Sequence, residues 1–154
     1  MLKKRKIPQN TRRIDELNTS IVLSDINTIR ELLINNIDVN IPDRNGVYPI
    51  MFAVEYGNAN ALISLLRHGA NPNVIDKRNG YTPLMKALSG KYIPNRYLIV
   101  MLLLKNGADV NIISNHNKTA LYLAKVHNPR YVNLLRRFGA EFWENLTMDN
   151  NTIE

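Results

Sequence analysis

The sequence predicts an all-α solenoid of helix-turn-helix units, and three observations support this fold class. First, a pattern that starts at Asn45-Gly46 starts again at Asn79-Gly80, so that the two glycines are 34 residues apart. Second, each copy contains two apolar segments of helical length. Third, a glycine follows the second segment of each copy. A repeat of about this period is typical of a stacked solenoid.

The first helix of each unit has a recognisable start. Pro49 and Pro83 suit the first helical turn, where the missing N–H costs nothing and φ is already set. Thr82 and Thr119 can accept hydrogen bonds from the free amides of that turn. Small residues at the centre of these helices, Ala53, Ala87 and Ala124, allow each inner helix to lie close to its neighbours.

The second helix of each unit is expected within residues 61–66, 98–104 and 131–135. These segments are apolar over wide faces, as expected for helices sandwiched between repeats. Gly69, Gly107 and Gly139 follow them, where a left-handed C-cap is needed.

Short Asx-rich segments separate the units. Residues 43–46 and 76–80 have the composition of tight turns, so we expect β-hairpin-like fingers there. No unit could bury its apolar face alone, so the stack should behave as one cooperative domain.

Two motifs identify a family that this pattern resembles. Gly80-Tyr81-Thr82-Pro83-Leu84 and Gly107-Ala108-Asp109-Val110-Asn111 are similar to the start and the end of an ankyrin repeat. The resemblance implies about four repeats, of which the first and last are degenerate, joined by β-hairpin-like fingers into an ankyrin-repeat solenoid. The expected organisation is a basic tail (1–13), repeats at 14–42, 43–75, 76–113 and 114–141, and an acidic tail (142–154).

The resemblance is incomplete at two places. The histidine that the family carries early in its inner helix is replaced by Met51, Met85 and Tyr122. The third repeat has four extra residues between its helices, within residues 89–95. Such an insertion is either a tolerated lengthening of a surface loop or part of a binding surface.

Composition excludes several classes of function. The 154 residues include no cysteine, which rules out disulfides, thiolate zinc sites and a cysteine nucleophile. The longest aliphatic run, 98–104, is far shorter than the ~20 residues of a membrane span. No apolar stretch follows the basic amino terminus, so a signal peptide is not expected. Membrane insertion and secretion are therefore disfavoured.

No metal, cofactor or catalytic constellation is expected. The three imidazoles are His68 before a helix-ending glycine, His116 in a finger and His127 in a turn between helices. None has a second ligand at metal-binding spacing, and no glycine-rich phosphate loop is present. We interpret Trp143 as a cover for the last apolar face. These observations favour a non-enzymatic protein.

The net charge of +7 is unevenly distributed. Residues 1–13 contribute +6 and residues 141–154 contribute −4, which leaves +5 for the body. The basic run Lys3, Lys4, Arg5 and Lys6 is open to three interpretations: a solvated flank, a nuclear-import signal or a phosphate-contacting arm.

In proteins similar to this one, partners bind a concave face made by finger tips and inner helices. The resemblance places on that face Arg44, Asn45, Val47, Glu55, Tyr56, Lys77, Arg78, Asn79, Tyr81, Ser89, Tyr92, Asn115, His116 and Lys118. Tyrosine and arginine often carry binding energy at interfaces. Basic residues outnumber acids among these positions, which predicts a partner with an acidic surface.

The predicted function is a protein–protein interaction module, acting as adaptor, competitor or effector. It would be a monomer located in the cytoplasm, or in a host cell's cytoplasm if it is an effector. One alternative is a nuclear regulator resembling ankyrin-type inhibitors of transcription factors. The other is nucleic-acid binding through the basic arm.

The asparagines that end the repeats have two interpretations. Asn40, Asn73 and Asn111 resemble ankyrin asparagines that are hydroxylated in animal cells. The favoured interpretation is structural, with each side chain bonded to the backbone of a neighbouring finger.

Overall fold

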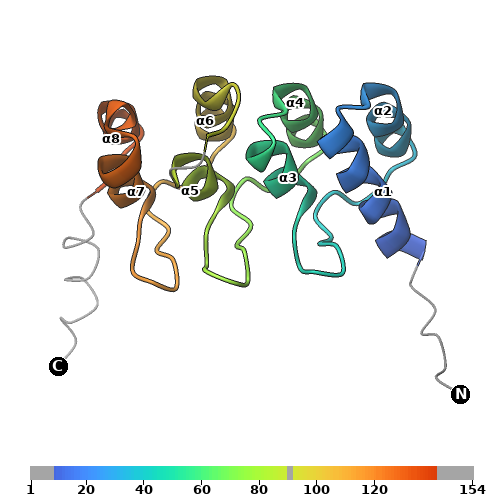
Figure 1. The fold of residues 1–154 in the computed structure, drawn as a ribbon, viewed down its shortest axis with the longest axis horizontal. Coiled ribbons are helices and arrows are strands. Elements are labelled where there is room, and N and C mark those ends of the chain that lie inside the picture. Colours follow the sequence, from blue (N-terminus) through green and yellow to red (C-terminus); the bar gives the residue numbers. More distant parts are fainter. Residues whose placement is uncertain (1–8, 90–91, 142–154) are drawn as a thin grey trace, which may run out of the picture.

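The computed structural model describes residues 9–89 and 92–141, which form helix pairs arranged in two rows (Figure 1). The inner row holds the first helix of each pair and the outer row the second. In chain order the elements are α1 (Gln9–Leu23), α2 (Ile26–Ile34), α3 (Pro49–Glu55), α4 (Ala59–Arg67), α5 (Pro83–Leu88), α6 (Arg96–Lys105), α7 (Ala120–His127), the 3-10 turn η1 (Pro129–Tyr131) and α8 (Val132–Arg137). The predicted all-α solenoid is confirmed.

The fingers project from one side of the inner row (Figure 1). Each is closed by a backbone hydrogen bond: Asp43 N to Val47 O at 2.8 Å, Asp76 N to Tyr81 O at 2.9 Å, and Ser114 N to Lys118 O at 2.9 Å. No β-strand occurs in the described ranges. The fingers are therefore bonded turns without a strand ladder.

The core follows the predicted pattern of small and capped positions. Ala53, Ala87 and Ala124 are fully buried, and the inner helices pack in sequence from α1 to α7. The Thr82 and Thr119 hydroxyls accept hydrogen bonds from the first turns of α5 and α7. The glycines after α4, α6 and α8 have φ values of +80°, +85° and +84°, as a left-handed C-cap requires.

Asparagine side chains connect successive repeats. Asn40 donates from Nδ2 to the Gly69 carbonyl at 2.9 Å, and its Oδ1 accepts from the Asn71 amide at 2.8 Å. Asn73 and Asn111 make the same pair of bonds to the next repeat. Each asparagine bonds neighbouring backbone with both halves of its amide, as the structural interpretation expected, but the bonded residues lie in the turn after the next outer helix and not in a finger.

The first helix begins earlier than the predicted boundary at residue 14. Helix α1 starts at Gln9, so Arg12 and Arg13 belong to the helix rather than to a basic tail. Arg13 donates from Nη2 to the Asn35 carbonyl at 3.2 Å, which fixes this turn against the end of α2. The predicted basic run at residues 3–6 and the predicted cover by Trp143 lie outside the described residues.

Candidate functional site

A cleft of about 340 Å³ lies on the finger side of the inner row, at the junction of the second and third repeats. We call it the finger-side cleft. Its walls come from the end of α3, the second finger, α5 and the inserted segment. The residues that line it are Glu55, Tyr56, Asn79, Tyr81, Lys86, Ser89, Tyr92 and Ile93. Six of these eight were expected from the sequence.

An ion-pair network crosses the cleft. Lys86 Nζ lies 2.8 Å from Glu55 Oε1 and 2.7 Å from Asp76 Oδ2, so one ammonium joins α3 to the second finger through α5. The Lys86 and Asp76 side chains are 16% and 10% exposed, whereas Glu55 is 45% exposed. Lys86 and Asp76 are therefore the less exposed part of the network, and Glu55 presents its carboxylate at the mouth of the cleft.

The pKa values of Asp76 and Lys86 both shift in the direction that favours the charged form of the side chain. Burial acts to raise the pKa of Asp76, but hydrogen bonds from Lys86 and the Arg78 amide outweigh it, so that the pKa is lowered. Burial acts to lower the pKa of Lys86, but its bonds to Asp76 and Glu55 outweigh that effect and raise it. Asp76 and Lys86 are thus both charged at neutral pH.

Lys86 is the residue that the sequence analysis missed. It occupies the position that Phe52 holds in the second repeat and Leu123 in the fourth. Leu123 is 1% exposed. A cation at a position that is apolar in the neighbouring repeats was the signal that could have identified it.

The inserted segment contributes directly to the cleft. Ile93 is buried at 6% exposure, while Tyr92 beside it is 88% exposed. Asn95 adopts a left-handed conformation and donates from Nδ2 to the Gly57 carbonyl at 3.3 Å. Ile93 and Asn95 therefore anchor the part of the segment that follows Tyr92, and Tyr92 lies at the cleft rim.

The remaining predicted site residues are distributed along the three fingers. Arg44 forms an ion pair with Asp15 of α1 and lines a separate hollow, while Val47 is half-buried against the core. Asn115, His116 and Lys118 lie on the third finger, with the Lys118 ammonium 5.8 Å from the Tyr122 ring centroid. Lys77, Arg78 and Asn45 lie on exposed or half-buried turns. The fourteen predicted residues do not form one site.

The fingers also touch one another. The Asn115 amide donates to the Asn79 carbonyl at 3.1 Å, and the Lys77 side chain passes beside Gly46. A Cβ at Gly80 would lie 2.6 Å from the Asn115 amide nitrogen. The second finger is therefore held between its neighbours, which orders the wall that carries Asn79 and Tyr81.

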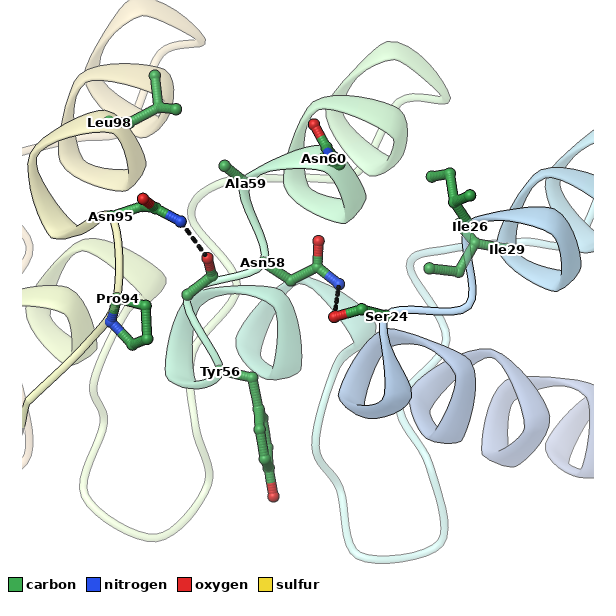
Figure 2. Close-up of a pocket in the computed structure, with 11 residues that line it drawn as sticks. Ser24, Ile26, Ile29, Tyr56, Asn58, Ala59, Asn60, Pro94, Asn95 and Leu98 are labelled. Carbon is green, nitrogen blue, oxygen red and sulfur yellow. Dashed lines mark hydrogen bonds between the residues drawn. The ribbon is translucent and has the colours of Figure 1, made fainter.

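A second hollow, of about 490 Å³, lies where the turns of the first three helix pairs meet (Figure 2). Asn58 reaches Ser24 and Asn95 reaches Gly57, so polar side chains join the three repeats at this edge. Tyr56 points out of this hollow, to the side on which the fingers project (Figure 2). Its ring is half exposed, which makes it available to the finger-side cleft.

The described residues contain no group of three or more His, Asp or Glu side chains placed to hold a metal. His68 caps the end of α4, with Nδ1 at 2.8 Å from the Ser64 carbonyl. No described helix has the length and apolarity to cross a bilayer. The arrangement offers ordered aromatic and charged groups for contact.

Comparison with known proteins places the pattern in a family. A family model described as ankyrin repeats (3 copies) matches residues 20–113. The chain is 32% identical over 124 residues to "Ankyrin repeat, SAM and basic leucine zipper domain-containing protein 1" of Dasypus novemcinctus, covering 79% of this chain and 26% of that protein.

Two viral proteins are also similar. A putative ankyrin repeat protein of fowlpox virus is 32% identical over 106 residues, which is 68% of this chain and 17% of the viral protein. An IkB-like protein of African swine fever virus is 48% identical over 48 residues, 31% of this chain and 20% of that protein. The matched part of the chain spans about a quarter or less of each of these three relatives.

Proposed function

The chain belongs to the ankyrin-repeat family, and from that premise we propose that it binds a protein partner through the finger-side cleft. Ankyrin repeats generally mediate protein–protein interaction, and the family is typically non-enzymatic. The observation that carries the proposal is the presence of Tyr56, Tyr81 and Tyr92 around one ordered ion-pair network.

Three tyrosines around a fixed charge are suited to recognition. Tyrosine supplies a large contact area with few rotatable bonds, so little conformational entropy is lost on binding. The Lys86 network is already ordered by its own ion pairs, so no rearrangement is needed to receive a partner. We propose that the partner inserts an apolar side chain between the tyrosines and a hydrogen-bonding group near Asn79.

The charge of the partner follows from the exposed cations at this face. Arg44 is engaged by Asp15, and Lys86 by Glu55 and Asp76. Lys77 and Arg78 remain exposed at the second finger. We therefore propose acidic residues on the part of the partner that meets this finger, which would mainly speed association.

Affinity capture with the full chain tests this proposal. We expect Tyr81→Ala and Tyr92→Ala each to weaken binding of the captured protein by about tenfold or more, as central aromatic contacts do. The control is Ile34→Ala, which removes an exposed apolar side chain from an outer helix. If all three variants bind the captured protein equally well, the finger-side cleft is not the binding site.

A second candidate is a nuclear regulator resembling ankyrin-type inhibitors of transcription factors, which the similarity to a viral IkB-like protein favours. Its test is cellular location after Lys3, Lys4, Arg5 and Lys6 are changed to Gln. Deletion should stop at residue 8, because residues 9–13 belong to α1. Unchanged nuclear location would exclude the basic run as the import signal.

Nucleic-acid binding through the basic arm is the weaker alternative. The neighbouring part of the solenoid, residues 9–60, holds seven acidic and four basic residues. An acidic surface beside the arm would repel phosphates. A steep fall of DNA or RNA affinity with salt would nevertheless establish this function.

A further inference from the structure

The outer row of helices is packed unevenly along its length. Helix α2 packs on α4 and α4 packs on α6, but the contact between α6 and α8 is much sparser. The last outer segment starts as a 3-10 turn at Pro129 and continues as a helix of only six residues. This shortened element leaves the outer row open at its carboxyl-terminal end.

A cleft of about 460 Å³ occupies this opening. We call it the outer cleft. It is lined by Tyr97 of α6 and by Arg130, Tyr131, Asn133, Leu134 and Arg137 of the last pair. The outer helices lie on the opposite side of the inner row from the fingers (Figure 1). The outer cleft is therefore a separate surface from the finger-side cleft.

Two arginines in this cleft are available for a ligand. Arg130 and Arg137 are exposed, and neither forms an ion pair with a carboxylate in the described part of the chain. The Arg130 guanidinium lies 5.0 Å from the centroid of the Tyr131 ring, which is almost fully buried. The ring positions the guanidinium face while leaving its N–H groups free to bind a carboxylate.

Apolar groups lie beside these charges. Tyr97 is 64% exposed, and Leu134 is half-buried on the facing element. The Tyr131 hydroxyl is buried with no hydrogen-bond partner among the described residues, so the cleft floor has an unsatisfied polar group. The site combines two cations, an exposed aromatic ring and an aliphatic side chain within one cleft.

The surrounding charge favours an anionic ligand. Residues 96–140 contain seven basic residues and a single acid, Asp109. An excess of this size attracts acidic segments and raises their association rate. No comparable excess surrounds the amino-terminal outer helices.

We propose that the outer cleft binds an acidic peptide segment of a partner protein. A carboxylate of the segment binds Arg130 and Arg137, and an adjacent apolar side chain packs against Tyr97 and Leu134. This assignment does not depend on the use of the finger-side cleft.

The observations favour a peptide over a nucleic acid. A nucleic acid needs positive charge along an extended path. The basic part of the solenoid ends near residue 61, and residues 9–60 hold seven acids against four bases. A short acidic segment can remain within the basic half, and its apolar side chain uses the part of the cleft that a phosphate backbone would not.

Fluorescence anisotropy with the full chain tests the proposal. The probe is a labelled peptide of about twelve residues in which glutamates flank one Leu and one Phe. A second labelled peptide has Gln in place of every Glu. We expect Arg130→Gln with Arg137→Gln to weaken binding of the acidic peptide by about tenfold or more, as loss of charge-assisted hydrogen bonds does. Tyr97→Ala should weaken it severalfold, and the Gln peptide should not bind.

The matched control is Arg30→Gln with Arg67→Gln, which removes the same charge from exposed positions of α2 and α4. Binding should change less than about threefold there. Equal losses in both double variants would overturn the proposal in favour of diffuse attraction. No binding by the unchanged chain would overturn it too, as would displacement of the peptide by a single-stranded oligonucleotide whose own affinity depends on the same two arginines.

Discussion

The amino-terminal and carboxyl-terminal halves of the solenoid share one backbone plan but have opposite surfaces. Residues 9–60 hold seven acids and four bases, whereas residues 96–141 hold two acids and seven bases. The outer helices are closely packed in the first half and open between α6 and α8 in the second. Prolines, glycines and asparagines that define the repeat recur in both halves, so the fold tolerates this divergence.

The halves also differ in how their charges are held. In the first half Arg44 and Asp15 form a largely exposed ion pair. In the middle of the chain Lys86 forms a mostly buried pair with Asp76. Buried and exposed ion pairs respond differently to loss of one partner, because only the buried one leaves an unsolvated charge.

The largest effect is expected at Gly57, where the end of α3 contacts the inserted segment of the third repeat. A Cβ at Gly57 would lie 2.3 Å from the Pro94 carbonyl oxygen, and φ there is +64°. We expect Gly57→Ala to lower the free energy of unfolding by about 2–4 kcal/mol, from backbone strain and displacement of the inserted segment. Urea denaturation measures the change.

Gly69→Ala is the control for this experiment. Its φ is +80°, but no atom lies within 4 Å of the added Cβ. We expect a loss of about 1 kcal/mol from conformation alone. If the two substitutions lower the free energy of unfolding equally, the contact with Pro94 is not the reason for the loss at Gly57.

Removing the central cation should give the next largest effect. Lys86→Met leaves Asp76 buried without its ammonium partner, and we expect a loss of about 2 kcal/mol in the free energy of unfolding. Arg44→Gln, which breaks the exposed pair in the first half, should leave the urea midpoint unchanged. If Arg44→Gln destabilises the protein more than Lys86→Met does, the exposed ion pair contributes more to stability than the buried one, contrary to our expectation.

The pH dependence of stability should trace to Asp76. Because its pKa is lowered in the folded state, the unfolded state binds the proton more tightly. The stabilisation is therefore complete above the unfolded pKa of about 3.9 and is lost as pH falls through the folded value. Urea midpoints between neutral and strongly acidic pH measure this dependence, and Asp76→Asn should make it shallower.

Asp25 provides the comparison in the first half. Hydrogen bonds from Thr28, first from its hydroxyl and then from its amide, lower the pKa of Asp25 at the start of α2, where it is exposed. Asp25→Asn should flatten the acidic slope less than Asp76→Asn does. The opposite ranking would mean that the buried network is not the main acid-sensitive element.

The smallest expected effects concern unsatisfied polar groups, one near each end. Asn18 is buried with neither amide atom bonded, and the Tyr131 hydroxyl is likewise unbonded among the described residues. We expect Asn18→Leu and Tyr131→Phe to raise the free energy of unfolding by about 1 kcal/mol or less, because a desolvated polar group is removed.

Asn58 is the matched control for Asn18. Its amide donates to the Ile21 carbonyl at 2.9 Å and accepts from the Ala61 amide at 3.0 Å. Asn58→Leu should therefore destabilise the protein, as thermal unfolding can show. Destabilisation by Asn18→Leu as well would indicate that Asn18 has a partner.

Local signals were sufficient to predict most of the fold. Pro83 and Thr82 marked the start of α5, and Gly107 marked the end of α6, because these residues act through backbone conformation and nearest amides. The role of Asn40 was also predictable, since its motif recurs at Asn111. The boundary that we predicted at residue 14 lies inside α1, where the bond from Arg13 to the Asn35 carbonyl joins residues that are distant in the sequence.

The candidate site was predicted only in part. Tyr81 and Tyr92, which we expected on one face, line the finger-side cleft together with four others of the predicted residues. Lys86 was missed because its importance depends on Glu55 and Asp76, which lie on other elements. Arg44 was counted as a free cation because Asp15, its partner, is distant in sequence.

The sequence by itself determined the repeat, its helix starts and its helix ends, because those depend on interactions within a few residues. Only the tertiary structure decided which charges are neutralised and where the stack opens. The Arg44–Asp15 and Lys86–Glu55 ion pairs join side chains about thirty residues apart, and both clefts combine residues of neighbouring repeats, so their geometry depends on how those repeats pack. In this protein, recognition chemistry is therefore a property of the interfaces between repeats.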